Sequence, residues 1–400
     1  MLRLGRPLIT PERLYMAALG LSGLAAVCSI ALAPAERGLL VASMAGATLG
    51  SAIGGISVDT FLMSRPKGWV WGRGAPWILA IVFGCVLLSG AVAALVIAVA
   101  GIGSYVVGIG AAGCLTIFNA CSSLALRMQR FRFVYSVRAT AGAALIVGYG
   151  WFYLHGQLGG LAWGTAYLAA QALAALTLGV AVVRWALRTR PEVPGELATQ
   201  RTDLMADLSA MTKLHIGVSA QMVTSRMDQV LLARLAGAGS LGVYALAVAA
   251  LEFAQAGAVV RSQKILTNRD QAASIPKMTP VVTTTLPVAV FSVVALGVVG
   301  FIRPEYHQAW ILGLLLLPGS IAAALGKTWS AALLIRRGET AASAVSVISA
   351  VVAVPAYYVF VSWQGAIGAA VAMSGAYAVY AAGAFWSLRT QSRPLAERVV

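Results

Sequence analysis

The sequence contains little charge, and very little of that charge is negative. Charged residues make up 10% of the 400 residues, with 13 Asp and Glu against 29 Lys and Arg, and there are only 3 His. Hydrophobic residues make up 60%, whereas a soluble domain is about half apolar and about a quarter charged. The surplus apolar surface must face lipid, which excludes a large water-soluble catalytic module.

Enzyme and cofactor signatures are also missing from the sequence. It has no HExxH motif and no paired cysteines at zinc-binding spacing. Gly326-Lys327-Thr328 resembles the end of a phosphate-binding P-loop, but Ile321 stands where that motif requires glycine. We therefore predict that the chain is not an enzyme and uses no cofactor or metal ion.

Long apolar runs are abundant instead. A helix of about 20 apolar residues spans a bilayer, and twelve runs of roughly this length are present. They cover 14–34, 38–62, 77–100, 103–126, 139–155, 161–185, 214–235, 241–260, 280–302, 309–334, 341–362 and 365–387. The pattern predicts an all-α polytopic membrane protein with about 12 transmembrane helices.

The positive residues gather on one side of this predicted topology. With the N-terminus in the cytoplasm, 24 of the 29 Lys and Arg lie in cytoplasmic segments or at cytoplasmic ends of spans, and Arg226 and Lys327 lie within spans. Cytoplasmic loops of membrane proteins carry such an excess of Lys and Arg. The distribution predicts a multi-pass protein of the inner (cytoplasmic) membrane with both termini cytoplasmic. It also explains the net charge of +16 without a nucleic-acid partner.

Two similar turns divide the chain into halves. One is Pro34-Ala35-Glu36-Arg37-Gly38, and the other runs from Leu235 to Gly242, with the two final glycines 204 positions apart. We predict an N-terminal six-helix bundle (1–187), a cytoplasmic linker (188–213) and a C-terminal six-helix bundle (214–400). A pseudo-two-fold axis along the membrane normal would relate the bundles, and transporters built this way bind substrate between them. Glu36 and Arg37 are expected to cap helices in an outer turn.

Charged residues inside spans are costly and by default mark function. Arg226 and Lys327 are predicted to bind an anionic headgroup, because guanidinium and ammonium groups both attract phosphate oxygens. Gln221 and Gln255 lie on the same polar faces and complete this predicted substrate site.

Two acidic residues accompany these cations. Asp228, which has no obvious partner, and Glu252 are predicted ion-coupling residues that bind a proton or a sodium ion. Arg226 and Asp228 point roughly 160° apart on a helical wheel, so Arg226 is expected to pair with Glu252. The alternative is that the interior charges are structural ion pairs that lock helices together.

The stretch from Arg226 to Gly237, continuing through Leu241-Gly242-Val243-Tyr244-Ala245, resembles the start of the second half of bacterial polysaccharide flippases. These are a branch of the multidrug/oligosaccharidyl-lipid/polysaccharide exporter superfamily, and the turn from Pro34 to Gly38 resembles the corresponding element of the first half. The resemblance implies outward flipping of a polyprenyl-diphosphate-linked oligosaccharide by alternating access. Membrane lipid, a glycan polymerase and glycosyltransferases are the corresponding candidate partners.

Two other functions stay open on the sequence alone. The chain could be a cation-coupled multidrug exporter of the same superfamily, with Asp228 or Glu252 as the coupling site. It could also be a membrane scaffold for a glycan-synthesis complex that transports nothing, with purely structural interior charges.

Overall fold

The computed structural model describes residues 11–59, 62, 75–188, 204–267 and 274–390, and every regular element in these ranges is a helix. Several predicted features lie outside the described residues. They are most of the central linker (189–203), both chain ends (1–10 and 391–400) and the cytoplasmic loop that carries Arg65, Lys67 and Arg73.

The long helices described between residues 11 and 188 correspond to the first six predicted spans. They are α1 (Pro11–Cys28), α2 (Pro34–Gly54), α5 (Ala75–Ala100), α6 (Tyr105–Arg127), α7 (Phe131–Leu154) and α8 (Gly160–Arg188), with the short 3-10 helix η1 (Ser29–Ala31) after α1. The predicted fifth span, 139–155, is too short: α7 begins eight residues earlier, because its first two turns are helical although Arg132, Ser136 and Arg138 interrupt their apolar run.

The second half contains α9 (Leu204–Ala254), α10 (Ala256–Thr267), α11 (Thr279–Ile302), α12 (Ala309–Arg337) and α13 (Glu339–Arg389), with the short helix η4 (Pro304–Tyr306) before α12. Two of these elements are pairs of helices joined at a glycine. Gly237 in α9 has φ 81° and Gly365 in α13 has φ 56°. Glycine adopts positive φ at no steric cost, so each marks a change of chain direction between two predicted spans.

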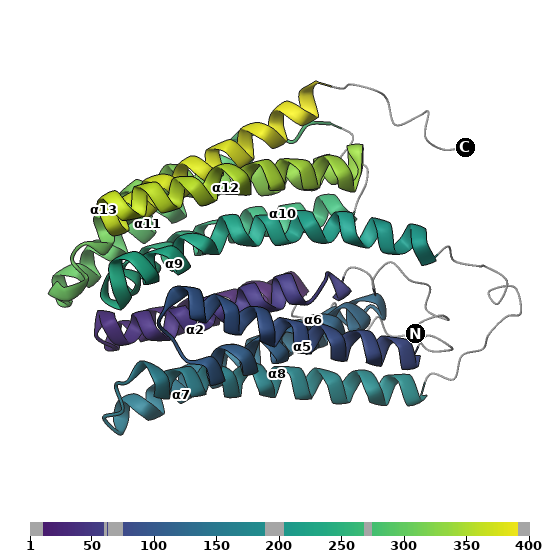
Figure 1. The fold of residues 1–400 in the computed structure, drawn as a ribbon, viewed down its shortest axis with the longest axis horizontal. Helices are drawn as coiled ribbons and strands as arrows, with labels where there is room; N and C mark the ends of the chain where they lie inside the picture. The colour runs from purple at the N-terminus through teal and green to yellow at the C-terminus, as the bar shows by residue number, and fades with distance from the viewer. Residues whose placement is uncertain (1–10, 60–61, 63–74, 189–203, 268–273, 391–400) are drawn as a thin grey trace, which may run out of the picture.

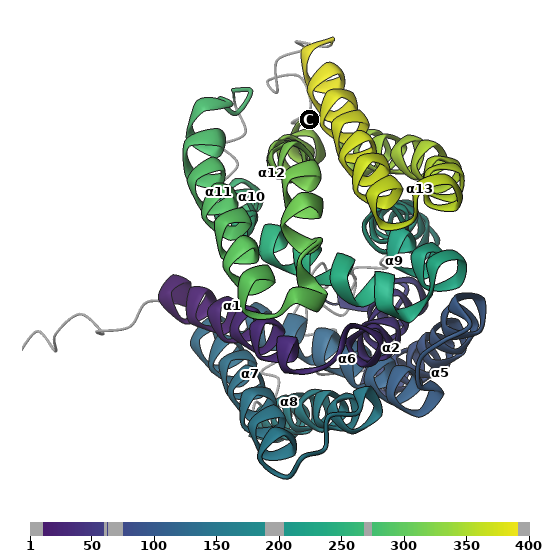
Figure 2. The same cartoon turned by 90° about the vertical axis from the view of Figure 1, so that its left-hand side faces the viewer.

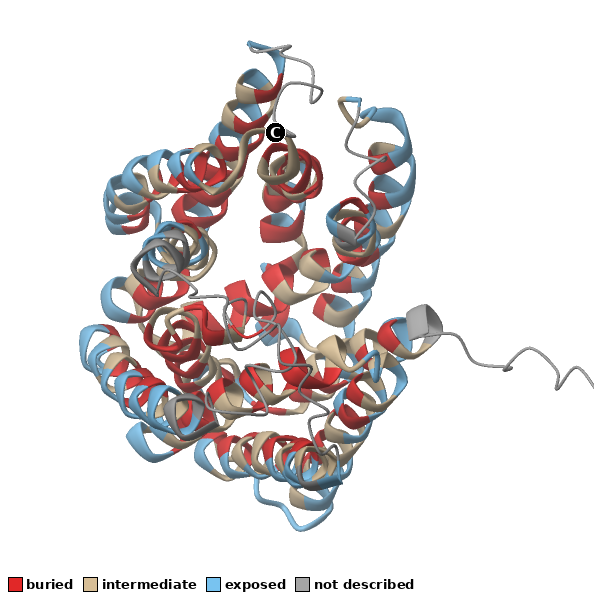
Figure 3. Ribbon diagram, turned by 90° about the vertical axis from the view of Figure 1, so that its right-hand side faces the viewer, coloured by how far each residue is buried: buried red, intermediate tan, exposed pale blue. Residues whose placement is uncertain are grey.

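Within the described ranges, eight helices are long and apolar enough to cross a membrane. Large apolar side chains cover the outside of the bundle, such as Phe301 (88% exposed) and Trp363 (74% exposed). Figure 3 shows exposed helix faces around the periphery and buried faces toward the middle. Such a surface suits lipid and not water, and the chain is a polytopic helical membrane protein.

The helices form two groups that meet along α2 and α9. In Figure 1 the helices of residues 11–188 lie on one side and those of residues 204–390 on the other, and Figure 2 shows the same division from one end. Of the four clusters of buried side chains, two lie within the first group and one within the second. The largest cluster joins both groups, because it contains Ala42, Leu49 and Ala100 together with residues of α9, α11, α12 and α13. Small residues on α2 permit this close helix contact.

Glu36 caps a helix, as the sequence predicts, but the helix is α8 and not its own. Its Oε2 accepts a hydrogen bond from the backbone N of Gly160, the first residue of α8, at 2.6 Å. A carboxylate at a helix N-terminus satisfies a free N–H and interacts favourably with the helix dipole.

Glu36→Ala should therefore lower the stability of the protein by about 0.5–2 kcal/mol. The measurement is the thermal unfolding midpoint of the full chain in detergent. Glu36→Gln keeps an acceptor oxygen and should recover part of the loss. Equal midpoints for Glu36→Ala and the unmodified protein would contradict the capping role.

Candidate substrate cavity

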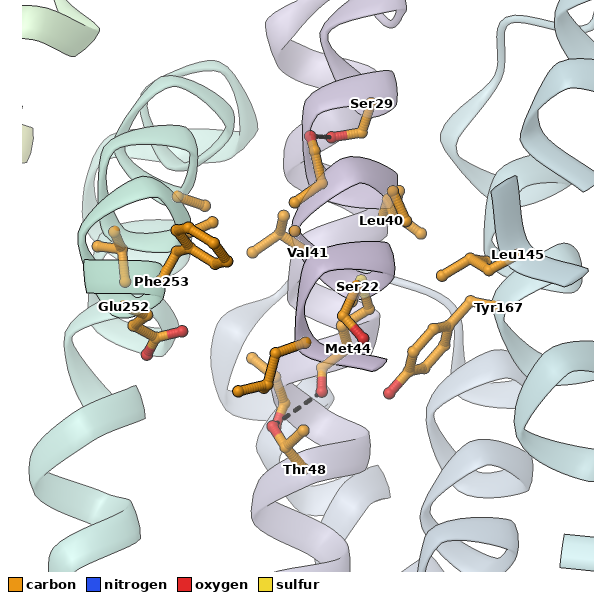
Figure 4. Close-up of a pocket in the computed structure, with 18 of the residues that line it drawn as sticks. Ser22, Ser29, Leu40, Val41, Met44, Thr48, Leu145, Tyr167, Glu252 and Phe253 are labelled. Carbon is orange, nitrogen blue, oxygen red and sulfur yellow. Dashed lines mark hydrogen bonds between the residues drawn. The ribbon is translucent and has the colours of Figure 1, made fainter. Parts of the chain in front are cut away.

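A cavity of about 410 Å³ lies between the two groups of helices. Its walls come from α1, η1, α2, α7 and α8 on one side and from α9 and α10 on the other. Figure 4 shows Glu252 and Phe253 of α9 on one side, Leu145 and Tyr167 on the opposite side, and residues of α1 and α2 between them. The cavity is therefore placed where a substrate would contact both halves.

An ion pair between Arg226 and Glu252 lies on the wall of this cavity. One guanidinium nitrogen of Arg226 is 3.1 Å from each carboxylate oxygen of Glu252. The two residues belong to the two helices of α9, and the turn at Gly237 between them brings the side chains together. The predicted pairing is confirmed. Because the side chains are 25% and 33% exposed, a ligand in the cavity can reach both.

Asp228 lies outside the cavity lining and has a partner that the sequence analysis did not identify. Its side chain is fully buried, and the Tyr244 hydroxyl donates a hydrogen bond to Oδ2 at 2.5 Å. Tyr244 is itself fully buried and also contacts Met373 Sδ at 3.1 Å. The second carboxylate oxygen, Oδ1, is buried without a hydrogen-bond partner among the described residues. As the helical wheel predicts, Asp228 does not pair with Arg226.

Lys327 and Gln255 contact each other, but neither lines the main cavity. Lys327 Nζ donates to Gln255 Oε1 at 2.7 Å, and Gln255 is also 3.5 Å from Ser320 Oγ. Gln255 is buried and Lys327 is half-buried between α10 and α12. Gln221 lies half-buried on α9 and is likewise not part of the cavity wall. Of the four predicted substrate-binding residues, only Arg226 reaches the cavity.

Arg37, which the sequence predicts to cap a helix in the outer turn, lines the cavity instead of an open surface. Its side chain is buried, with 2% of its surface exposed. Its Nε donates to Ser29 Oγ at 2.8 Å, and another guanidinium nitrogen donates to the backbone carbonyl of Gly242 in the opposite half. The only signal in the sequence was the similarity of the two turns that meet here.

Close backbone contacts join the two halves beside Arg37. A Cβ atom on Gly38 would lie 1.9 Å from the carbonyl oxygen of Ala238, and one on Gly242 would lie 1.9 Å from that of Pro34. The hydroxyl of Tyr306 also donates to the carbonyl of Leu32 at 2.8 Å. The two halves are therefore tightly packed at this end of the cavity.

Among the residues that the structure describes, the charged ones on the cavity wall are Arg37, Arg226 and Glu252. The wall thus carries one more positive than negative group, since Asp228 is turned toward Tyr244 and lies outside it. Polar side chains that the sequence analysis did not single out also line the cavity, namely Tyr15, Tyr149, Tyr167 and Gln229. The arrangement can hold an anionic group near Arg226 and amphipathic groups along the tyrosines.

The fold, two groups of membrane helices around a cavity, is shared with several solved structures. The chain is similar to the lipid II flippase MurJ in an inward closed conformation (TM-score 0.61, 14% identity, 93% of this chain and 86% of that chain). It is also similar to an inward-facing multidrug resistance MATE family transporter of the MOP superfamily (0.60, 12%, 97% and 95%). A third similar structure is MATE in the straight conformation (0.57, 14%, 94% and 93%).

These comparisons confirm, at the level of the fold, the resemblance to the exporter superfamily that the turns predict. No protein-family model matches the chain, and no curated protein of similar sequence was found.

Proposed function

We propose that the protein is a flippase that moves a polyprenyl-diphosphate-linked oligosaccharide across the cytoplasmic membrane by alternating access, without enzymatic chemistry. The observation that carries the proposal is the cavity between the halves, with the guanidinium of Arg226 on its wall. The similarity in fold to a lipid II flippase supports a lipid-linked substrate. Polymerase and glycosyltransferase partners would supply or consume such a substrate.

The charge balance of the cavity favours an anionic substrate. The sequence alone balances two interior cations, Arg226 and Lys327, against Asp228 and Glu252. In the structure Asp228 is hydrogen-bonded to Tyr244 outside the cavity wall, whereas Arg37 lies on the wall. The described part of the wall therefore carries a net positive charge. Guanidinium groups offer forked donors to phosphate oxygens, so Arg226 would hold the diphosphate. Lys327 and Gln255 would support the α10–α12 contact from outside the cavity.

Alternating access needs two bundles that can separate at either end, and the arrangement of helices supports this. Counting the two helices of α9 and of α13 separately, with α10 continuing the second helix of α9, gives six membrane-crossing segments in each half. We propose twelve spans in two bundles, related by a pseudo-two-fold axis and joined by the linker 188–213. Both termini would lie in the cytoplasm. The tight packing around Gly38 and Gly242 would then be the closed outer end of an inward-facing state.

A second candidate is a cation-coupled multidrug exporter. The aromatic lining of Tyr15, Tyr149, Tyr167 and Phe253, together with the Glu252 carboxylate, would suit an apolar cation. The similarity in fold to multidrug transporters agrees with this. In either mechanism the buried Asp228–Tyr244 pair is the proposed ion-coupling site, since a carboxylate with one unpartnered buried oxygen can accept a proton or a cation.

Reconstitution of the full chain in vesicles separates these candidates. A flippase should move a fluorescent polyprenyl diphosphate that carries a sugar, and Arg226→Ala should reduce the rate at least about tenfold, equivalent to about 1.4 kcal/mol. Arg234→Ala is the matched control, because Arg234 is exposed on the same element and does not line the cavity. Efflux of ethidium that depends on Asp228 would instead establish the drug exporter. Transport of neither compound would leave only the scaffold.

A further inference from the structure

A second cavity, of about 210 Å³, lies inside the first half of the protein. Its wall comes from α1, α6, α7 and α8, and we call it the side pocket. It adjoins the main cavity, because five residues line both spaces: Tyr15, Leu19, Ser22, Leu145 and Gln171. The two spaces are therefore direct neighbours, as a ligand that occupies both would require.

Two polar groups of the side pocket, the guanidinium of Arg138 and the side-chain amide of Asn119, do not line the main cavity, whereas the amide of Gln171 lines both spaces. None of the described Asp or Glu residues lines the side pocket. The Arg138 guanidinium carbon lies 5.3 Å from the ring centre of Phe118. Stacking on an aromatic ring orients a guanidinium while its N–H donors stay available in the guanidinium plane.

This combination suits one chemical class in particular. A guanidinium binds a carboxylate through two parallel N–H donors, and an amide offers both donors and an acceptor to neighbouring hydroxyl groups. Tyr15 adds a ring with a polar end to the pocket wall. An acidic sugar presents all of these features at once, with one carboxylate, several hydroxyls and apolar ring faces.

We propose that the side pocket binds an acidic sugar residue of the transported glycan, with its carboxylate on Arg138 and its hydroxyls on Asn119 and Gln171. The inference rests on the proposed function, because it assumes that Arg226 holds the diphosphate of the same molecule in the main cavity. It adds a substrate class to that function: glycans with a uronate close to the lipid are preferred over neutral ones.

The experiment compares three probes on the purified full chain in detergent. They are farnesyl diphosphate, farnesyl diphosphate carrying glucose, and farnesyl diphosphate carrying glucuronate. The uronate probe should bind at least about tenfold more tightly than the glucose probe, equivalent to about 1.4 kcal/mol. Arg138→Gln should remove this preference and leave the affinity for sugar-free farnesyl diphosphate unchanged, which also shows that the variant is folded.

Two further variants sharpen the result. Arg138→Lys keeps the charge without the forked geometry and should retain only part of the preference. Arg132→Gln is the matched control, since Arg132 is exposed on the same helix and lines neither cavity. It should behave like the unmodified protein.

Other outcomes would overturn the inference in distinguishable ways. Equal binding of all three probes leaves the flippase intact and removes the sugar pocket. A loss of affinity for all three probes in Arg138→Gln would mean that Arg138 holds the diphosphate instead. If the unmodified protein binds no probe, while ethidium efflux is measurable, the proposed function fails together with the inference.

Discussion

Replacing Gly242 with alanine should force the two halves apart at the end where Gly38 and Gly242 meet, and it should reduce the proposed transport by about five- to 150-fold. The new Cβ would lie 1.9 Å from the Pro34 carbonyl oxygen and 2.8 Å from the carbonyl carbon. Both are backbone atoms at the start of α2 and cannot rotate away as a side chain could. Overpacking of this kind costs about 1–3 kcal/mol, and a bias of that size shifts a two-state equilibrium about five- to 150-fold.

The glycine at position 38 should respond in the same way, because the two contacts are reciprocal. Gly38 packs on Ala238, four residues before Gly242, and Gly242 packs on Pro34, four residues before Gly38. A reciprocal contact of equivalent residues is what a two-fold axis generates. Gly38→Ala and Gly242→Ala should therefore both accumulate a state that is open at this end, and the proposed transport should fall because alternating access requires this end to close in every cycle.

Gly239→Ala provides the matched control for these variants. Gly239 lies in the same turn, and a Cβ there would meet no atom within 4 Å. Spin labels on Leu158 and Phe301, exposed near the ends of α7 and α11, would report the separation of the two halves. The distance should increase in Gly242→Ala and stay unchanged in Gly239→Ala. An unchanged distance in both variants would mean that this contact is not a gate.

Sequence patterns identified the membrane helices well because hydropathy is a local property. The start of α7 is missed for the same reason: Arg132 and Arg138 interrupt the apolar run of its first two turns. The aromatic residues of these turns pack on neighbouring helices, Tyr135 on Tyr15 of α1 and Phe133 on Trp185 of α8.

Gly237 lies between the predicted spans 214–235 and 241–260, and Gly365 is the first residue of the predicted span 365–387. Both lie at span boundaries, since a change of direction between spans needs a residue that tolerates positive φ.

The sequence predicts a contact in the candidate site only where the depth of each residue along its own helix determines which side chains meet. The pairing of Arg226 with Glu252 follows from their positions on neighbouring segments of α9. The burial of Arg37 does not, because its partner is the carbonyl of Gly242, 205 residues away. The sequence alone gives no sign that a charged residue in a short turn between spans is buried, because the burial depends on where the opposite half packs. The same long-range contact holds Arg37 on the cavity wall.

Removing Arg226 and removing Glu252 should change substrate binding in opposite directions. Arg226→Gln removes forked donors from the cavity wall, and hydrogen bonds to charged groups contribute about 1.5–3 kcal/mol each. Binding of farnesyl diphosphate should weaken by about tenfold or more on this basis. Glu252→Gln removes the carboxylate that competes for the guanidinium at 3.1 Å. The same probe should then bind more tightly, while turnover falls because release is slower.

A purely structural ion pair between the two helices predicts a different pattern of binding and stability, so this comparison separates the two roles. If the pair only holds the two helices of α9 together, both variants should lower the thermal midpoint and alter binding in the same direction. The side chains are 25% and 33% exposed, and ion pairs in contact with water contribute only about 0–1 kcal/mol. Small, similar changes in midpoint with opposite changes in affinity are therefore the expected result. Arg234 is exposed on the same element, so Arg234→Gln is the control and should change neither the midpoint nor the affinity. A decrease in affinity in both Arg226→Gln and Glu252→Gln would instead establish a purely structural ion pair.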